Sequence, residues 1–290
     1  QNERELKEAG FNAIAVSREN ANENTFKDIE AGKYAVIILN PELLMGNYHV
    51  EQWWKKPKFT KRILNFIFDE GHCIKQWGSF RKEYLHVGEL RYLIPDIIPF
   101  YVASATLPPT ILHDVIESLR LRPDMTEKLI RSNERPDLRL MVRPLMYPAK
   151  SFKDLEFLIP DTFREGDSPP LKFLVFFDNT KEAEAACKRL RNRLPSNLRK
   201  KLVYFHSTMT QEYREEKVDD LRESEVWGKF TTDSFGMGLD VSDIKIVVQY
   251  KATCDMCTLW QRFGRAARGA EHVATVILLA EKKDLKDERE

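Results

Sequence analysis

The segment ILNFIFDEGHCIKQWGSFRKEY, residues Ile63 to Tyr84, decides how the chain folds. Its first part, Ile63 to Phe68, is a short and mostly apolar run of the kind that forms a strand buried on both faces of a sheet. Two carboxylates, Asp69 and Glu70, follow at the carboxyl end of that strand, where open α/β sheets bind their ligands. Such a pair suits nucleotide chemistry, because one carboxylate can hold magnesium and the other can orient or deprotonate the attacking water. An isolated Asp-Glu pair is also an ordinary surface turn, so the choice depends on the motifs downstream.

The bulk composition fits two domains of ordinary size. The chain has 290 residues, of which 42% are hydrophobic. With 46 basic and 45 acidic residues its net charge is +1, which neither requires nor excludes a nucleic-acid partner. No apolar run approaches the ~20 residues that cross a membrane, so we expect no membrane partner. The opening QNERELKEAG has the pattern of an amphipathic helix rather than of a signal peptide, so we expect the chain to begin inside a domain.

Four cysteines, Cys73, Cys187, Cys254 and Cys257, are too few and too scattered for a disulfide framework and indicate a reducing compartment. Cys254 and Cys257 form a C-x-x-C pair. A structural zinc site needs two more ligands at suitable spacing, and the sequence shows none nearby. We therefore expect these two cysteines to pack on a helix surface or in a core.

Apolar runs alternate with helical patterns along the chain, which predicts parallel sheets. The expected strands are 12–16, 34–39, 63–68, 98–103, 171–177, 202–205, 227–232, 244–250 and 273–280. The expected helices are 3–9, 25–31, 109–119, 180–194 and 212–221. Trp53 and Trp54 are expected to pack in a core rather than to stack on bases. The polar segment Arg131 to Arg139 separates the two halves, and we place the boundary there, giving domains 1–131 and 132–290.

Two further motifs follow expected strands. Ser104-Ala105-Thr106 comes after 98–103 and is, by itself, an ordinary hydroxyl-rich turn. Thr232 to Asp240 reads TDSFGMGLD, and Gly236 and Gly238 permit a close approach of the backbone to a phosphate or a turn with positive φ.

A third motif, Gln261 to Gly269, reads QRFGRAARG. Arg265 and Arg268 are three residues apart, so they would share one face if this segment were helical. A plain surface helix would have the same pattern, so this motif alone does not indicate a function. The stronger evidence is the order in which all these motifs occur.

In that order and spacing, DEGH, SAT, FGMG and QRFGRAAR resemble motifs II, III, V and VI of the RecQ-type helicases, over nearly the whole chain. Gly71 stands where the family usually has Ala, and Ala267 where motif VI usually has Gly. The loop between Trp77 and Phe80 is one residue shorter than in the family. This difference affects the direction in which Phe80 and Arg81 would point.

The resemblance implies an α/β fold of two tandem RecA-like parallel-sheet domains, the first incomplete. The phosphate-binding pattern G-x-x-x-x-G-K-[ST] does not occur, since neither Gly32-Lys33 nor Gly228-Lys229 fits it. We therefore expect the first third of the first domain, which carries motif I in the family, to be missing. The first domain would then hold motifs Ib, II and III, and the second would hold motifs IV, V and VI. The chain ends at Glu290, soon after the last expected strand, so we expect the zinc and winged-helix region that often follows motif VI to be either absent or removed.

The resemblance also assigns roles to individual residues. The catalytic residues would be Asp69, Glu70, His72, Arg265 and Arg268. The residues that couple ATP to motion would be Ser104, Thr106, Gly236, Gly238, Asp240 and Gln261. The nucleic-acid contacts would be Pro41, Glu42, Trp77, Phe80 and Arg81, although Pro41 also suits the first position of a helix. Asp69 would hold Mg²⁺, through waters.

By resemblance, the full protein is expected to be a nuclear, ATP- and Mg²⁺-dependent helicase that acts on single-stranded and duplex DNA. It would move 3′ to 5′ by ATP-driven domain closure, and this chain alone would bind ATP poorly. The alternative is a non-catalytic nucleic-acid-binding or scaffold protein on a degenerate helicase core. An RNA helicase is a third possibility, which the QWG–FR loop disfavours because it resembles that of the DNA group.

Overall fold

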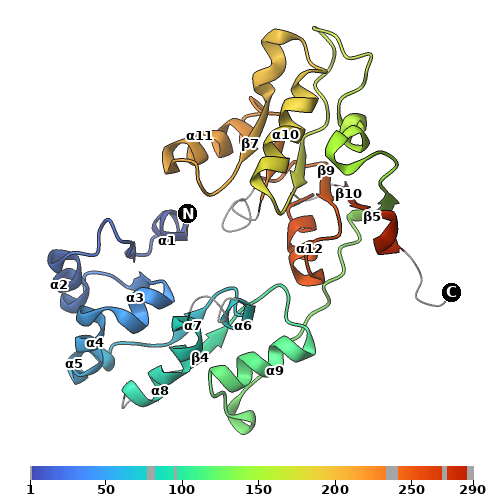
Figure 1. Cartoon of the computed structure of the whole chain (residues 1–290). Helices are drawn as coiled ribbons and strands as arrows, with labels where there is room; N and C mark the ends of the chain where they lie inside the picture. Colours follow the sequence, from blue (N-terminus) through green and yellow to red (C-terminus); the bar gives the residue numbers. More distant parts are fainter. Residues whose placement is uncertain (1, 77–81, 95–96, 233–240, 270–272, 286–290) are drawn as a thin grey trace. The chain divides into compact units, whose positions relative to one another are not determined.

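The computed structural model describes residues 2–76, 82–94, 97–232, 241–269 and 273–285 (Figure 1). It divides into two compact units, unit 1 (Gln1–Asn133) and unit 2 (Glu134–Glu290). Each unit combines parallel strands with helices, so the predicted α/β class with parallel sheets is confirmed. None of the helices in the described ranges is long and apolar enough to span a membrane.

Unit 1 contains two pairs of short parallel strands. β1 (Ala13–Ala15) pairs with β2 (Val36–Ile38), and β3 (Phe66–Phe68) pairs with β4 (Phe100–Val102). Each strand lies inside one of the four runs that the sequence predicts for this half. The β3–β4 pair matters most here, because it carries the carboxylate pair and the SAT turn to the same edge.

Helices surround these strands. They are α1 (Asn2–Glu8), α2 (Glu23–Ala31), α3 (Pro41–Gly46), α4 (Tyr48–Trp54), α5 (Pro57–Thr60), α6 (Cys73–Gln76), α7 (Glu83–His86), α8 (Leu90–Leu93) and α9 (Pro109–Ser118). Gly32 ends α2 with a left-handed φ of 86°, directly after the predicted range 25–31. Trp53 and Trp54 are 2% and 6% exposed and pack with Phe59, which confirms that they belong to the core.

Unit 2 is built on a six-stranded parallel sheet with the order β5-β10-β9-β6-β8-β7. The strands are β5 (Leu138–Pro144), β6 (Phe173–Phe176), β7 (Leu202–Phe205), β8 (Gly228–Thr231), β9 (Ile246–Tyr250) and β10 (Ala274–Ala280). The sequence predicts all of these except β5. This strand lies at the edge of the sheet and exposes Arg139 and Arg143, so its sequence looks like a polar linker.

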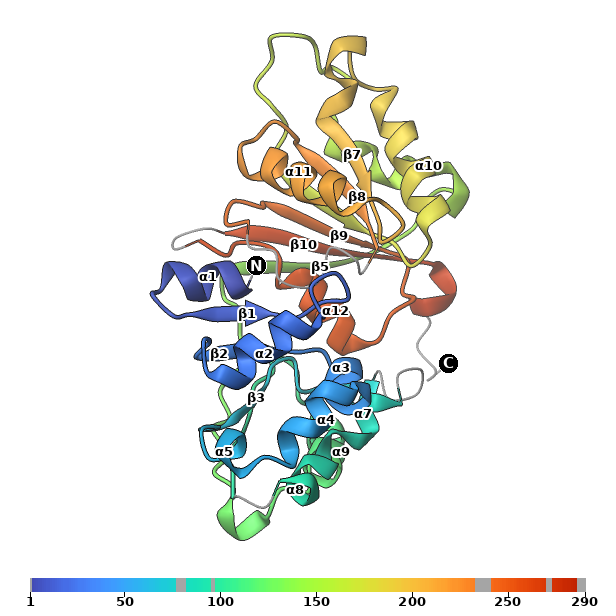
Figure 2. The same cartoon turned by 90° about the vertical axis from the view of Figure 1, so that its left-hand side faces the viewer.

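The two faces of this sheet bury separate apolar clusters. Phe173 and Val175 of β6 point to the face covered by α10 (Thr180–Arg191), whereas Leu174 and Phe176 point to the other face. That second face is covered by α11 (Gln211–Arg222) and α12 (Met256–Phe263). Figure 2 shows α10 and α11 on the two sides of β7 and β8. A strand buried on both faces explains the continuous apolar run of β6.

One charged side chain lies inside this core. Lys229 of β8 is 0% exposed, and its Nζ lies 4.9 Å from the centre of the Phe205 ring. Burial lowers the pKa of Lys229 to about 7, because the charged ammonium loses its hydration.

The C-x-x-C pair lies at the start of α12. Both Cys254 and Cys257 are partly buried, and Cys254 packs against the apolar cluster that α11 and α12 cover. Burial raises the pKa of Cys257. In the portion of the chain that the structure describes, no group of three or more His, Cys, Asp or Glu side chains could hold a metal ion.

Candidate functional site

The carboxylate pair and the SAT turn lie side by side in unit 1. The β3–β4 ladder continues past both strands, because Ala103 N donates to Phe68 O (3.0 Å) and Gly71 N donates to Ala103 O (2.8 Å). Asp69 Oδ1 accepts a hydrogen bond from Glu70 N (2.9 Å). Glu70 has a left-handed φ of 50°, a conformation that costs energy for a residue with a side chain. Such strain is frequent at functional sites, where neighbouring contacts hold the residue in place.

His72 links the two motifs. Its ring is 3% exposed, and its Nδ1 lies 2.8 Å from Ser104 Oγ and 3.4 Å from Glu70 Oε2. Ser104 Oγ in turn accepts from Thr106 N (3.2 Å). Three of the predicted site residues, His72, Ser104 and Thr106, therefore form one hydrogen-bonded cluster, and a fourth, Glu70, lies within ion-pair distance of His72. A change at the carboxylate can reach the SAT turn through a single buried imidazole.

Gly71, where the family usually has Ala, has a local structural reason. A Cβ added to Gly71 would collide with Cγ1 of Val102, which lies on the neighbouring strand β4. Val102 is β-branched and has few alternative rotamers, so it could not move aside easily. The glycine lets the turn after β3 lie against β4.

Pro41 and Glu42 lie in the first turn of α3, directly after β2. Asn40 caps this helix by accepting from Leu43 N (2.8 Å), and Pro41 occupies its first position. A hollow of about 440 Å³ opens beside them at the carboxyl ends of β1 and β2. Its lining residues are Val16, Ser17, Arg18, Asn40, Glu42, Leu43, Gly46 and Asn47.

Six predicted site residues lie outside the described residues. They are Trp77, Phe80, Arg81, Gly236, Gly238 and Asp240. Their proposed roles stay predictions from the sequence.

In unit 2 the segment QRFGRAARG is only partly helical. Gln261 lies on α12, but the helix ends at Phe263, so Arg265 and Arg268 follow it in a non-helical loop. The expectation that the two arginines share a helical face is therefore wrong. Farther along, Ala267 has a left-handed φ of 50°, so a helix could not run through this segment. Arg265 is 9% exposed, whereas Arg268 is exposed and donates from Nε to Gly264 O (3.1 Å).

The strain at Ala267 gives a testable prediction. We expect Ala267→Gly to be about 1 to 2 kcal/mol more stable than Ala266→Gly, because both variants lose a buried methyl group but only the first relieves a left-handed φ. Urea unfolding of the two variants measures this difference. Equal losses of stability would contradict the strain at Ala267.

Arg262 also lies inside this motif, but its role was not predicted from the sequence. Arg262 is 3% exposed; its Nη2 donates to Asp178 Oδ1 (2.6 Å) and its Nη1 to Gln249 Oε1 (2.5 Å). Its guanidinium also lies over the Phe176 ring. The side chain thus fastens α12 to the carboxyl ends of β6 and β9. The only sequence signal for this role is that Arg262 lies at the centre of an otherwise apolar helix face.

Arg135 was also missed, because it lies in the segment that reads as a linker. Its Nη2 donates to the carbonyl oxygens of Ala266 (3.0 Å) and Ala267 (3.2 Å). Its Nε and Nη2 also bind the carboxylate of Asp137 at 3.0 and 2.6 Å. This hydrogen bonding lowers the pKa of Asp137, so the carboxylate stays charged at neutral pH.

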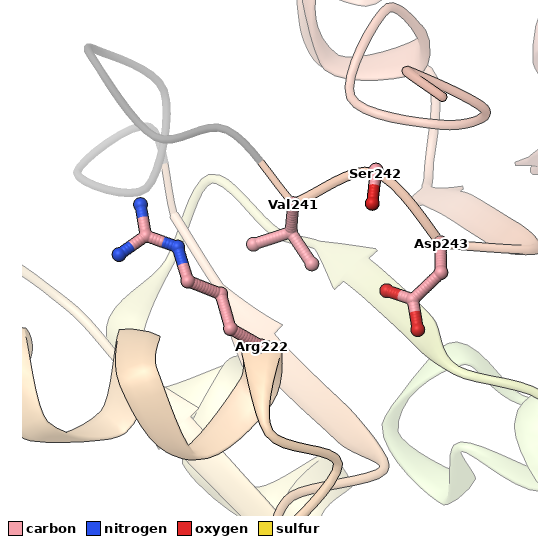
Figure 3. Close-up of a pocket in the computed structure, with 4 residues that line it drawn as sticks. All are labelled: Arg222, Val241, Ser242 and Asp243. Carbon is pink, nitrogen blue, oxygen red and sulfur yellow. The ribbon is translucent and has the colours of Figure 1, made fainter. Parts of the chain in front are cut away.

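A second hollow, of about 310 Å³, is lined by Arg222, Val241, Ser242 and Asp243 (Figure 3). It lies before β9, at the amino ends of the strands, whereas parallel sheets bind ligands at the carboxyl ends. Its charged side chains already have partners, because Asp243 accepts from Lys172 Nζ (2.8 Å) and Arg222 pairs with Asp219 (2.8 Å). None of the predicted site residues that the structure describes lines it.

Two family models match the chain. Residues 1–115 match the DEAD/DEAH box helicases, and residues 155–270 match the helicase conserved C-terminal domain.

Curated proteins of similar sequence are helicases. The bifunctional 3′-5′ exonuclease/ATP-dependent helicase WRN of Mus musculus is 29% identical over 84% of this chain and 17% of that protein. The ATP-dependent DNA helicase RecQ of Haemophilus influenzae is 25% identical over 82% of this chain and 35% of that protein. The chain thus spans well under half the length of these relatives.

Solved structures show the same fold. The DUF1998 helicase MrfA bound to DNA and AMPPNP superposes with a TM-score of 0.72, covering 97% of this chain and 40% of that one at 17% identity.

Proposed function

Because the chain belongs to the helicases that combine a DEAD/DEAH box domain with a conserved C-terminal domain, we propose that it is the core of an ATP-dependent DNA helicase of the RecQ type. The observation that carries the proposal is the cluster in which His72, Ser104 and Thr106 are hydrogen-bonded and Glu70 lies 3.4 Å from His72. The RecQ-type and WRN-type relatives support DNA as the nucleic acid.

The carboxylate pair suits Mg²⁺ together with a nucleotide. Magnesium keeps several waters and binds through one or two carboxylates and the phosphates of its substrate. Asp69, which is exposed, would hold the ion through waters, and the ion would neutralise charge on the phosphates.

In our proposal Glu70 orients the attacking water. Its carboxylate is 40% exposed on one side and lies 3.4 Å from the buried His72 on the other. A change in the charge or position of Glu70 can therefore affect His72, and His72 can in turn affect Ser104. In our proposal this is how ATP hydrolysis in unit 1 is coupled to the movement of the nucleic acid.

We assign the stabilisation of the transition state to Arg265 or Arg268. An arginine that meets the developing charge is worth about a thousandfold or more in rate. In our proposal the two units close on ATP to bring this arginine to the phosphate, and cycles of closure drive movement 3′ to 5′ along one DNA strand. Unwinding of duplexes with a 3′ or a 5′ single-stranded tail tests the polarity.

The first test measures DNA-stimulated ATP hydrolysis, on this chain and on a form extended upstream along its gene to a phosphate-binding loop. We expect activity in the extended form and a loss of about a hundredfold or more in Glu70→Gln, since Glu70 activates the water. The matched control is Glu89→Gln, which removes an exposed carboxylate paired with His86. It is expected to keep full activity.

A different result would favour the second candidate. If both forms lack ATPase activity but bind single-stranded DNA, the enzyme proposal fails and a binding module on a degenerate helicase core remains. The motif residues Asp69, Glu70, Arg265 and Arg268 are all present in the chain, which favours the enzyme.

A further inference from the structure

We infer that Arg135 is a positioning residue for the loop 264–269, here called the arginine loop, which carries Arg265 and Arg268. The inference rests on the proposed function in one respect, because it takes these two arginines to act on ATP. The position of the loop itself can be measured whether or not the chain is part of an ATPase.

The arginine loop depends on partners outside itself for its backbone hydrogen bonds. Ala266 and Ala267 are 0% and 4% exposed and lie beyond the end of α12, so neither water nor a helix satisfies their carbonyl groups. Arg135 Nη2 donates to both carbonyls, at 3.0 and 3.2 Å. Without this donor, two buried acceptors in consecutive residues would lose a charge-assisted hydrogen bond.

The other side of the loop is held by backbone groups of the segment before β9. Ala267 N donates to Ile244 O (3.1 Å), and Gly269 N donates to Ser242 O (3.3 Å). Arg135 therefore completes a set of contacts that grips the loop from two sides. Such over-determination is what allows Ala267 to keep its left-handed conformation.

Arg135 is itself held rigidly. Its guanidinium binds the Asp137 carboxylate with two nitrogens, and Arg135 O accepts from Leu138 N (2.9 Å). Asp137 O accepts from Ala274 N (3.0 Å), which ties the same segment to the start of β10. A planar guanidinium can serve the carboxylate and two carbonyls at once, whereas a lysine ammonium cannot reproduce that fork.

Arg135 is the second residue of unit 2, directly after the division at Asn133. The segment that enters unit 2 from unit 1 is thus in direct contact with the loop that carries the candidate arginine finger. A displacement of this segment would break the contacts to Ala266 and Ala267. Arg135 is in this way placed to make the arginine loop sensitive to the connection between the units.

The experiment compares Arg135→Gln and Arg135→Lys with the matched control Arg139→Gln, which removes an exposed arginine of β5. Hydrogen exchange is measured in the whole chain at the amides of Ala267 and Gly269. We expect exchange about tenfold faster in Arg135→Gln, a smaller increase in Arg135→Lys, and no change in Arg139→Gln. The amides of β9 and β10 are expected to exchange as in the unmodified chain, which shows that the fold is intact.

Unchanged exchange at Ala267 and Gly269 in both Arg135 variants would overturn the inference. In the form extended upstream, Arg135→Gln is expected to lower kcat about tenfold while KM for ATP stays within about twofold, because the loop acts on the transition state. Faster exchange with an unchanged kcat would overturn the functional role of Arg135. Faster exchange in a chain whose extended form hydrolyses no ATP would support the positioning of the loop and refute only the proposed ATPase.

Discussion

An Asp178→Ala variant is expected to lose about 3 kcal/mol of the free energy of unfolding of unit 2, because it leaves the buried guanidinium of Arg262 without its carboxylate. Breaking a fully buried ion pair costs about 3 to 5 kcal/mol. We expect the lower end of this range, since the Asp178 side chain is 34% exposed and water can enter in its place. The loss also loosens α12, which carries Gln261 and leads into the arginine loop.

The measurement is urea unfolding followed by hydrogen exchange in β6 and β9, so that unit 2 is observed separately from unit 1. The control is Asp219→Ala, whose pair with Arg222 is exposed at 60% and 31% and should be worth less than about 1 kcal/mol. Adding Arg262→Met to Asp178→Ala is expected to recover part of the loss, because it removes the buried charge. A loss in Asp178→Ala no larger than that in the control would refute this account.

Lys229→Met is expected to have a large effect in the opposite direction. At pH 7 it should raise the free energy of unfolding of unit 2 by about 2 to 4 kcal/mol, because it removes an ammonium group from a fully buried position and keeps an apolar side chain of similar length. The same unfolding measurement detects the gain. The matched control is Lys188→Met, which changes an exposed lysine of α10.

The pH dependence of this effect has a definite sign. Burial lowers the pKa of Lys229 from 10.5 to about 7, so above pH 7 the unfolded chain keeps a proton that the folded chain releases. The stability contributed by this group therefore rises with pH above about 7, and below that value its penalty is constant. Between pH 7 and 8.5 the advantage of Lys229→Met should shrink by roughly 1.4 kcal/mol per pH unit. An advantage that does not change with pH would contradict the buried, titrating amine.

The sequence predicts the parallel fold well where a strand or helix has its own local pattern. The strand β6 is a continuous apolar run, β9 is mostly apolar, and capping residues such as Asn179 mark where helices begin. The edge strand β5 has no such pattern, since Leu140 and Val142 are exposed and arginines alternate with them. The helix α12 was not among the predicted helices, and the left-handed alanine at position 267 leaves no mark in the sequence.

The site could be predicted from the sequence only where its residues belong to recognisable motifs. Glu70 and His72 are close in the chain, and the two parallel strands that deliver them and Ser104 could be expected to be neighbours. The contacts of Arg262 with Asp178 and of Arg135 with Ala266 join residues 84 and 131 positions apart. No local pattern in the sequence predicts such distant pairs. Only the folded chain shows that Arg262 and Arg135 hold the loop that contains the motif.

The edge of the unit 2 sheet has a consequence for biosynthesis. β5 and β10 are the first and last strands of the unit, and they pair in parallel from Leu138↔Ala274 to Pro144↔Ala280. The ribosome adds about 5 to 20 residues per second, so roughly ten seconds or more pass between the synthesis of β5 and that of its partner β10. Throughout that time Leu140 and Val142 have no neighbouring strand, which makes this stretch a target for chaperones. A circularly permuted unit 2, with β10 joined directly to β5, would turn this last pairing into an early one and should fold faster and aggregate less.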